Sequence, residues 1–213
     1  MTDETAAAAA NEDGRRLRGR RTRESILEAA MDLASVEGLD GLTIGRLAAE
    51  LGMSKSGLFA HFGSKEELQL ATIDAARAIF IEEVIEPARK AERGLPRLEA
   101  LLDHWFTYKR GEIFYGGCFF DAIRTEYDSR EASPVKEAIR NDFQTWMELL
   151  ANRVRSAQAA GHLHPDEDPE QLAFELDALG GAANLRFQLN RDEAAFERAR
   201  RASRARLAAL TVH

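Results

Sequence analysis

Residues 42–68 constrain the fold more than any other stretch, because two short helical patterns follow each other there with only a glycine turn between them. The first pattern has apolar residues at the i, i+3, i+4, i+7 spacing of one helical face: Ile44, Leu47, Ala48 and Leu51. Thr43 precedes it as an N-cap candidate, and Gly52 ends it because glycine readily adopts a left-handed backbone. Ser54 is the N-cap candidate of the second helix. Such a helix-turn-helix places its second helix in the major groove of DNA.

The first turn of the second helix is polar, as a helix that meets base edges and phosphates requires. Lys55 can bind guanine or a phosphate, and the hydroxyls of Ser54 and Ser56 can donate or accept. Gly57 costs a helix interior about 1 kcal/mol relative to alanine, which points to a close approach of its backbone to DNA or to a neighbouring helix. The alternative interpretation is an ordinary helix pair with a polar rim.

Charged and capping residues flank this unit on both sides. Six arginines precede it, in a segment with a single acid: Arg15, Arg16, Arg18, Arg20, Arg21 and Arg23. Beside a helix-turn-helix we favour contact of this arm with the DNA backbone or minor groove, and a solvated tail is the alternative. Downstream, Ser64 and Glu67 form a capping box, and Lys65 in the first turn of that helix predicts a phosphate contact.

The net charge of −7 does not oppose DNA binding, because the charges are unevenly distributed. Residues 14–65 carry nine basic side chains against six acidic ones, and DNA affinity depends on the local field rather than on the sum. The rest of the chain is acidic, which discourages non-specific wrapping of DNA.

Residues 20–75 resemble the DNA-binding domain of the TetR family of bacterial transcription regulators, through the run RTRESILEAAMDLASVEGLDGLTIGRLAAELGMSKSGLFAHFGSKEEL. The resemblance implies an all-α homodimer with an N-terminal domain on DNA and a larger C-terminal domain that holds an effector. It assigns phosphate contacts to Thr43, Ser54, His61 and Lys65. It assigns base-edge contacts to Arg46, Lys55, Ser56 and Gly57. Phe59 stands where the family usually has a phosphate-binding tyrosine, so that contact is absent unless His61 replaces it.

The remaining sequence also predicts helices throughout, which gives the whole chain about nine helices. It shows no period-two pattern of a β-strand. Ser133-Pro134 and Asp168-Pro169 are start signals, each an N-cap followed by proline. We divide the chain into a disordered arm (1–19), a helix-turn-helix domain (20–65) and an effector-binding and dimerisation domain (66–213). Small residues between 178 and 183 favour dimerisation through residues 169–210, and completion of the monomer core is the alternative.

Aromatic residues gather between residues 105 and 146. Ligand cavities are mostly apolar with a few polar groups, and we interpret this region as the effector pocket. Its candidate ligand-binding residues are Trp105, Tyr108, Phe114, Cys118, Phe119, Phe143 and Trp146. Polar groups to orient a ligand are available at His104, Asp121 and Arg124. Ordinary core packing is the alternative for each aromatic residue taken alone.

The sequence predicts a DNA-binding regulator, a repressor released from a palindromic operator by a small-molecule effector. We find no catalytic motif, expect no enzyme activity, metal or cofactor, and interpret His162 and His164 as part of a polar loop. The absence of a signal peptide or an apolar span predicts a cytoplasmic protein. Two alternatives stay open: a thiol-based redox regulator that uses Cys118, and a helical ligand-binding protein without specific DNA binding.

Overall fold

A computed structural model describes residues 3–111 and 113–212, with side chains from Leu17 onward. Its helices are α1 (Asp3–Gly41), α2 (Ile44–Glu50), α3 (Lys55–Phe59), α4 (Lys65–Phe80), a π-helical turn η1 (Ile81–Ile85), α5 (Glu86–Arg89), α6 (Leu95–Arg110), α7 (Phe119–Tyr127), α8 (Pro134–Ala159), α9 (Pro169–Asn190) and α10 (Ala194–Ala208). The all-α prediction is confirmed. Within the described ranges there are nine helices when α4, η1 and α5 are counted as one continuous helix, and no strand beyond an isolated bridge between Leu163 and Thr211.

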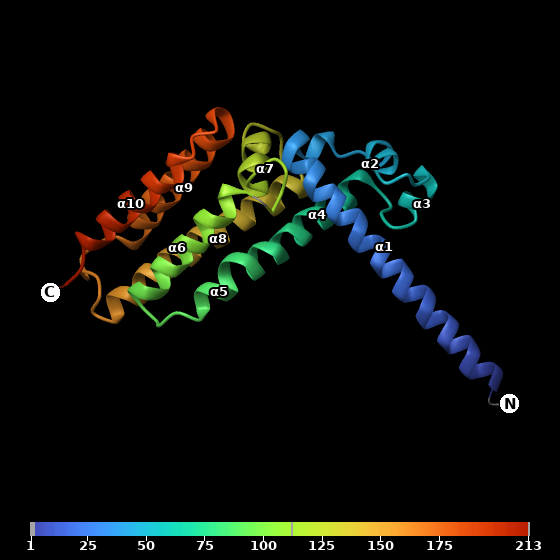
Figure 1. The fold of residues 1–213 in the computed structure, drawn as a ribbon, viewed down its shortest axis with the longest axis horizontal. Coiled ribbons are helices and arrows are strands. Elements are labelled where there is room, and N and C mark those ends of the chain that lie inside the picture. The colour runs from blue at the N-terminus through green and yellow to red at the C-terminus, as the bar shows by residue number, and fades with distance from the viewer. Residues whose placement is uncertain (1–2, 112, 213) are drawn as a thin grey trace.

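The first helix differs from its prediction. We expected a disordered arm over residues 1–19, whereas this segment is helical from Asp3 onward and continuous with α1. The alanine run at 6–10 explains the helix, because alanine has the highest helix propensity. The N-terminal half of α1 projects away from the rest of the molecule (Figure 1). Residues 1–2 and the side chains of Arg15 and Arg16 lie outside the described part.

Local capping signals define the helix-turn-helix as predicted. The Thr43 hydroxyl accepts a hydrogen bond from the Arg46 N–H at 3.1 Å, and the Ser54 hydroxyl accepts one from the Gly57 N–H at 3.0 Å. Gly52 has a φ of 62°, the left-handed conformation that ends α2. Helix α2 packs on α1 and α3 packs on α2, with Leu47 and Leu58 buried in the core, which fixes the orientation of α3.

One continuous helix, α4–η1–α5, joins this N-terminal unit to the larger helical body (Figure 1). Its capping box is present in a shifted form: Ser64 accepts from the Glu67 N–H, while the Glu67 carboxylate accepts from Gly63, one residue before the cap. The π-helical turn ends two residues before Pro87, which has no N–H to donate to the preceding turn.

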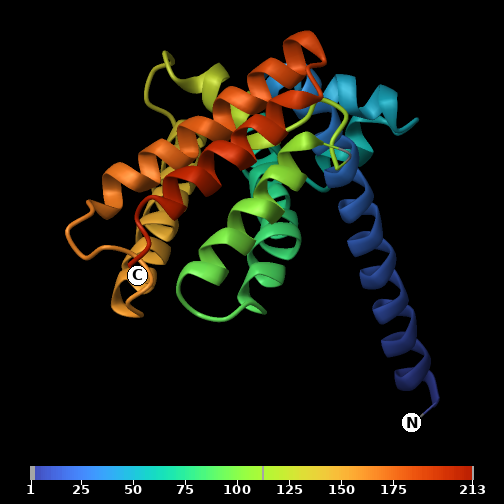
Figure 2. The ribbon, with the colours of Figure 1, turned by 60° about the vertical axis from the view of Figure 1, so that its left-hand side comes forward.

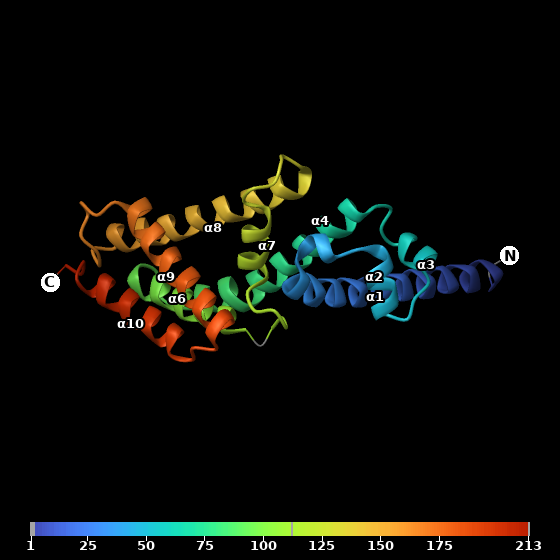
Figure 3. The ribbon, with the colours of Figure 1, turned by 90° about the horizontal axis from the view of Figure 1, so that it is seen from above.

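The body consists of α6, α8, α9 and α10, with α7 lying between it and α1. Helices α9 and α10 pack against each other, and α9 also packs on α8 and α6 (Figures 2 and 3). The predicted start signals hold, since Ser133 accepts from Lys136 N–H and Asp168 accepts from Glu170 and Gln171 N–H. In the described part of the chain, the helices are too short or too polar to cross a membrane.

Candidate DNA-binding surface and effector cavity

The first turn of α3 is exposed, as its proposed role requires. Ser54, Lys55 and Ser56 are all exposed, and the hydroxyls of the two serines lie 3.2 Å apart. A Cβ atom on Gly45 would lie 3.2 Å from Cε of Lys55, so the lysine side chain crosses the first turn of α2. A Cβ atom on Gly57 would lie 3.1 Å from the Ser54 hydroxyl oxygen. Glycine at 57 therefore also leaves space for the hydroxyl that caps α3.

Two other candidate DNA contacts are held by acids of the same chain. The Arg46 guanidinium lies 3.1 Å from both Glu37 and Glu50, and the hydrogen bond to Glu37 is the main reason that the pKa of Arg46 is raised. Lys65 Nζ donates to the Asp40 carbonyl oxygen at 2.9 Å and lies 3.4 Å from its carboxylate. Contact of either side chain with DNA requires exchange of these partners for phosphate or base atoms.

The remaining candidates lie at the edge of the same unit. Thr43 is exposed, His61 is half-buried, and Phe59 has 51% of its surface exposed on α3. The carbonyl oxygen of His61 accepts a hydrogen bond from Arg23 at 2.7 Å, and the Arg23 guanidinium stacks 4.1 Å from the centre of the Phe62 ring. This arginine of the predicted DNA-binding arm thus anchors α1 to the end of α3.

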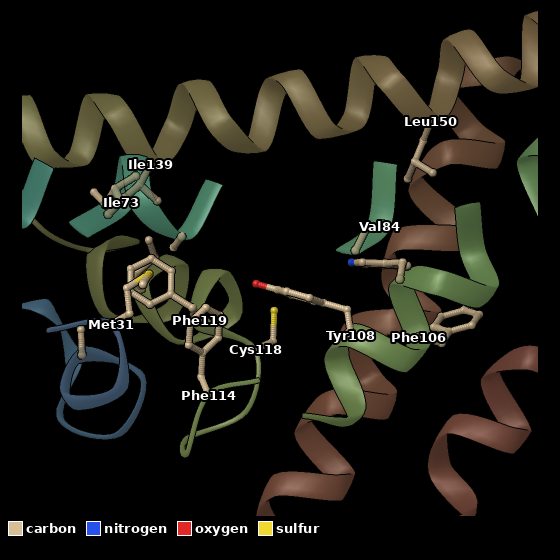
Figure 4. Packing of buried hydrophobic residues seen from close by; sticks show 14 of the residues in the cluster. Met31, Ile73, Val84, Phe106, Tyr108, Phe114, Cys118, Phe119, Ile139 and Leu150 are labelled. Carbon is tan, nitrogen blue, oxygen red and sulfur yellow. The ribbon is translucent and has the colours of Figure 1, made fainter. Parts of the chain in front are cut away.

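A cavity of about 160 Å³ lies in the helical body, between α4–η1, α6, α7, α8 and α9. Four of the seven predicted ligand-binding residues line it: Trp105, Cys118, Phe143 and Trp146. The other three, Tyr108, Phe114 and Phe119, are buried in the adjoining core, outside the lining (Figure 4). Of the predicted polar groups, Asp121 and Arg124 line the cavity and His104 does not.

Sequence reasoning missed the residues that α4, η1 and α9 contribute to this cavity, and those of α8 other than Phe143 and Trp146. They include Arg77, Phe80, Ile81, Asp142 and Asp177, and Lys109 of α6 was missed as well. The available signal was charge on otherwise apolar helical faces, as at Lys109, Asp142 and Asp177. Their partners come from distant segments, so the sequence does not show which of these charges meet.

Ion pairs within the lining satisfy its charged groups. Arg77 binds Asp142 through two nitrogens, at 2.6 and 3.1 Å, and this bonding raises the pKa of Arg77. Lys109, only 1% exposed, binds Asp121 and lies 4.6 Å from the centre of the Trp105 ring. The other charged groups pair in the same way: Arg124 with Asp121 at 2.5 Å and with Asp177 at 3.8 Å.

The single cysteine is poorly suited to redox sensing. Cys118 is 3% exposed, and burial, followed by the nearby Asp121 carboxylate, raises the pKa of its thiol to about 11. Lys109 Nζ lies 3.9 Å from the sulfur and lowers the pKa by less than these two effects raise it. Since the thiolate is the reactive form, this environment makes the thiol inert at neutral pH.

We therefore expect the folded protein to resist alkylation at pH 8, where about one Cys118 thiol in a thousand is ionised. Iodoacetamide labelling followed by mass spectrometry should show no adduct in the time that fully labels the denatured chain. Because the pKa of Cys118 is higher in the folded than in the unfolded state, the unfolded thiol ionises first as the pH rises. The free energy of unfolding should therefore fall as the pH rises above about 9. Rapid labelling of the native protein would contradict this environment for Cys118.

Helix α7 connects the cavity to the helix-turn-helix. Its Asp121 and Arg124 line the cavity, while its Glu126 accepts hydrogen bonds from the backbone N–H groups of Leu39 and Asp40, at 2.7 and 2.9 Å. These two N–H groups are available because Gly38, with a φ of 78°, kinks α1 immediately before them. One side chain thus joins the cavity-lining helix to the end of α1.

Asp40 extends this junction to the candidate phosphate site. Its carboxylate pairs with Arg130, just beyond α7, and with Lys65 of α4. The hydrogen bond from Arg130 is the largest cause of the lowered pKa of Asp40. The charges from α7 to Lys65 therefore form one continuous chain of contacts.

The outer face of α9 carries large apolar residues that the described part of the chain leaves exposed: Phe174, Leu185 and Leu189 are 62, 59 and 73% exposed. The inner face is closely packed. A Cβ atom on Gly180 would lie 2.3 Å from the Trp105 ring, so the indole rests directly against the α9 backbone.

Comparisons with known proteins agree with this architecture. Residues 26–72 match the family model of bacterial regulatory proteins of the tetR family, and residues 94–203 match a tetracyclin repressor-like C-terminal domain. An HTH-type transcriptional repressor of Mycobacterium tuberculosis is 30% identical over 154 residues, which are 67% of this chain and 80% of the relative.

Solved structures show the same fold. A TetR transcriptional regulator from Chloroflexus aurantiacus superposes with a TM-score of 0.83 at 25% identity, over 91% of this chain and 98% of the other. A TetR-family regulator from Cytophaga hutchinsonii gives a TM-score of 0.80 at 20% identity, over 92% and 98%.

The chain belongs to the TetR family. It is a DNA-binding transcriptional regulator with an N-terminal helix-turn-helix and a C-terminal ligand-binding domain, which confirms the prediction from sequence. The family is one of regulators rather than enzymes, and the redox alternative through Cys118 is not favoured.

Proposed function

We propose that this regulator is a homodimeric repressor that binds a palindromic operator through α3 and is released when a small molecule enters the cavity. The observation that carries the proposal is the α7 junction, which touches the cavity at Asp121 and α1 at Leu39 and Asp40 through Glu126. A ligand that favours one position of α7 would thereby favour one orientation of the helix-turn-helix. Its effect is limited to its differential affinity for the two states.

In this proposal the exposed polar residues of α2, α3 and the start of α4 contact DNA. Lys55, Ser56, Gly57 and Arg46 approach base edges, while Thr43, Ser54, His61 and Lys65 contact phosphates. The apolar residues with space around them, Trp105, Phe143 and Trp146, contact the ligand, with Cys118 at the cavity wall. Tyr108, Phe114 and Phe119 support that wall from the core.

The exposed apolar stripe of α9 supports dimerisation through residues 169–210. Such a stripe on a soluble chain marks a contact surface, and a dimer with recognition helices about 34–36 Å apart can read two half-sites of a palindrome. We expect Leu185→Glu to convert the proposed dimer to monomer, because each new charge would have to be buried in the apolar contact. Sedimentation equilibrium measures this change.

A matched control is Val36→Glu, which also places a charge on an exposed apolar residue, but on α1. It should leave the oligomeric state unchanged. A Leu185→Glu protein that remains dimeric at micromolar concentration would place the interface elsewhere.

The experiment that tests the function is binding of the purified protein to genomic fragments at physiological salt, starting with DNA upstream of its own gene. A palindromic site bound at least about a thousandfold more tightly than random DNA is expected for a specific regulator. Weak binding of equal strength to all fragments would contradict operator recognition by this chain.

A further inference from the structure

We propose that the cavity binds a small, uncharged aromatic molecule of one ring or two fused rings. The inference rests on the proposed function of the cavity as the effector site and specifies the chemical class of that effector. Three features of the lining carry it: its volume, its aromatic walls and the state of its charges.

The volume and the walls suit a flat apolar molecule. The cavity has about 160 Å³, and an engineered apolar cavity of about 150 Å³ in another protein binds benzene. The rings of Trp105 and Trp146 lie 4.7 Å apart at 42°, and Phe80 meets the edge of Trp146 at 5.4 Å and 87°. A ligand ring would extend this aromatic cluster through stacked or edge-to-face contacts, the two favourable arrangements for aromatic pairs.

The basic groups of the lining are already neutralised, which disfavours an anion. Arg77 is engaged in two bonds with Asp142, and Asp121 receives both Lys109 and Arg124. A ligand carboxylate would have to displace one of these acids, and the displaced acid would then lack its partner in a largely apolar site. Such a displacement adds no ion pair to the site, and the ligand carboxylate loses its hydration when it enters.

A cation is disfavoured even though aromatic cages often bind quaternary ammonium groups. Lys109 Nζ already lies 4.6 Å from the centre of the Trp105 ring, where a ligand cation would compete for the same quadrupole. The Asp177 carboxylate accepts the Trp146 Nε1–H at 3.0 Å and lies near Arg124. A cation would therefore meet a protein cation at the ring and an occupied carboxylate beside it.

The test uses pairs of ligands that share a shape and differ in charge. Tert-butylbenzene is paired with phenyltrimethylammonium, and benzamide is paired with benzoate. The chain has two tryptophans, and both line the cavity, so intrinsic fluorescence reports its occupancy directly. We expect saturable fluorescence changes with each uncharged member, at a Kd at least about tenfold lower than that of its charged partner.

A variant places the binding in the cavity. Leu149→Phe adds volume to the lining and should weaken binding of the uncharged members by about fivefold or more, as judged from the volume lost. Val36→Phe, which also adds an aromatic ring but on the exposed face of α1, away from the cavity and from the α9 stripe, should leave their affinity unchanged. Circular dichroism and operator binding by both variants show that they are folded.

Equal or tighter binding of a charged member, or no saturable change with either uncharged member, would overturn the proposal. A parallel titration on operator DNA separates this inference from the proposed function. Uncharged ligands that bind but leave the DNA complex intact would support the ligand class and contradict the effector role. Release of DNA by a charged member alone would support the effector role and contradict the ligand class.

Discussion

Replacement of Glu126 by glutamine is expected to weaken operator binding by about tenfold and to reduce its response to ligand. Glutamine keeps the size of the side chain but offers one oxygen, without charge, to the N–H groups of Leu39 and Asp40. The helix-turn-helix then samples more orientations relative to the body, and fewer of them match the operator spacing. A loss of about 1.4 kcal/mol corresponds to the tenfold change, close to the lower end of the range of about 1.5–3 kcal/mol for bonds to a charged group.

Two measurements follow from the same variant. Electrophoretic titration of operator DNA gives the affinity, and the thermal midpoint should fall by about 3–6 °C, as expected from such a loss in a domain of this size. Glu131→Gln is the matched control, since Glu131 is an exposed glutamate just beyond α7. A Glu126→Gln protein with unchanged midpoint and unchanged affinity would show that this junction does not orient the DNA-binding domain.

Replacement of Lys55 by alanine is expected to have the largest effect on DNA recognition. Lys55 is exposed in the first turn of α3, and unlike Arg46 and Lys65 it has no acidic partner among the described residues. The proposed dimer would present it twice, so loss of about 1–3 kcal/mol per base contact predicts a fall in operator affinity of at least about thirtyfold.

The salt dependence of binding distinguishes the two contacts that Lys55 can make. A lost phosphate contact weakens binding to all sequences and lowers the salt slope by about 0.9 for each contact, whereas a lost base contact relaxes specificity with little change in slope. Lys90→Ala, an exposed lysine at the end of α5, is the control. Unaltered operator affinity in Lys55→Ala would contradict α3 as the recognition helix.

The helix-turn-helix could be predicted from sequence because its determinants are local. Thr43 and Ser54 cap helices through bonds to residues three positions away, and Gly52 ends α2 through its own backbone conformation. The same is true of Ser133 and Asp168 in the body. Signals that act over three or four residues are visible in a single sequence, and they define where the long helices begin and end.

The cavity and its connection to α1 could be predicted only in part. The aromatic region between 105 and 146 pointed to it, but α4 and α9 contribute Phe80 and Asp177 from outside that range. Glu126 bonds to residues 86 and 87 positions away, and nothing in its neighbourhood distinguishes it from other glutamates. Pairing over such distances depends on how the helices pack, which composition and periodicity do not specify.

The contact between Trp105 and Gly180 has a consequence for how two subunits respond together. Helix α9 rests on a wall of the cavity with one face and presents Leu185 and Leu189 on the other. In the proposed dimer, two α9 helices would pack about 8–10 Å apart, so each cavity would lie one helix away from the shared interface. A ligand ring that displaces Trp105 in one subunit would shift its α9, against which α9 of the second subunit packs. Effector binding to the two subunits is therefore expected to be coupled, with a Hill coefficient that departs from one.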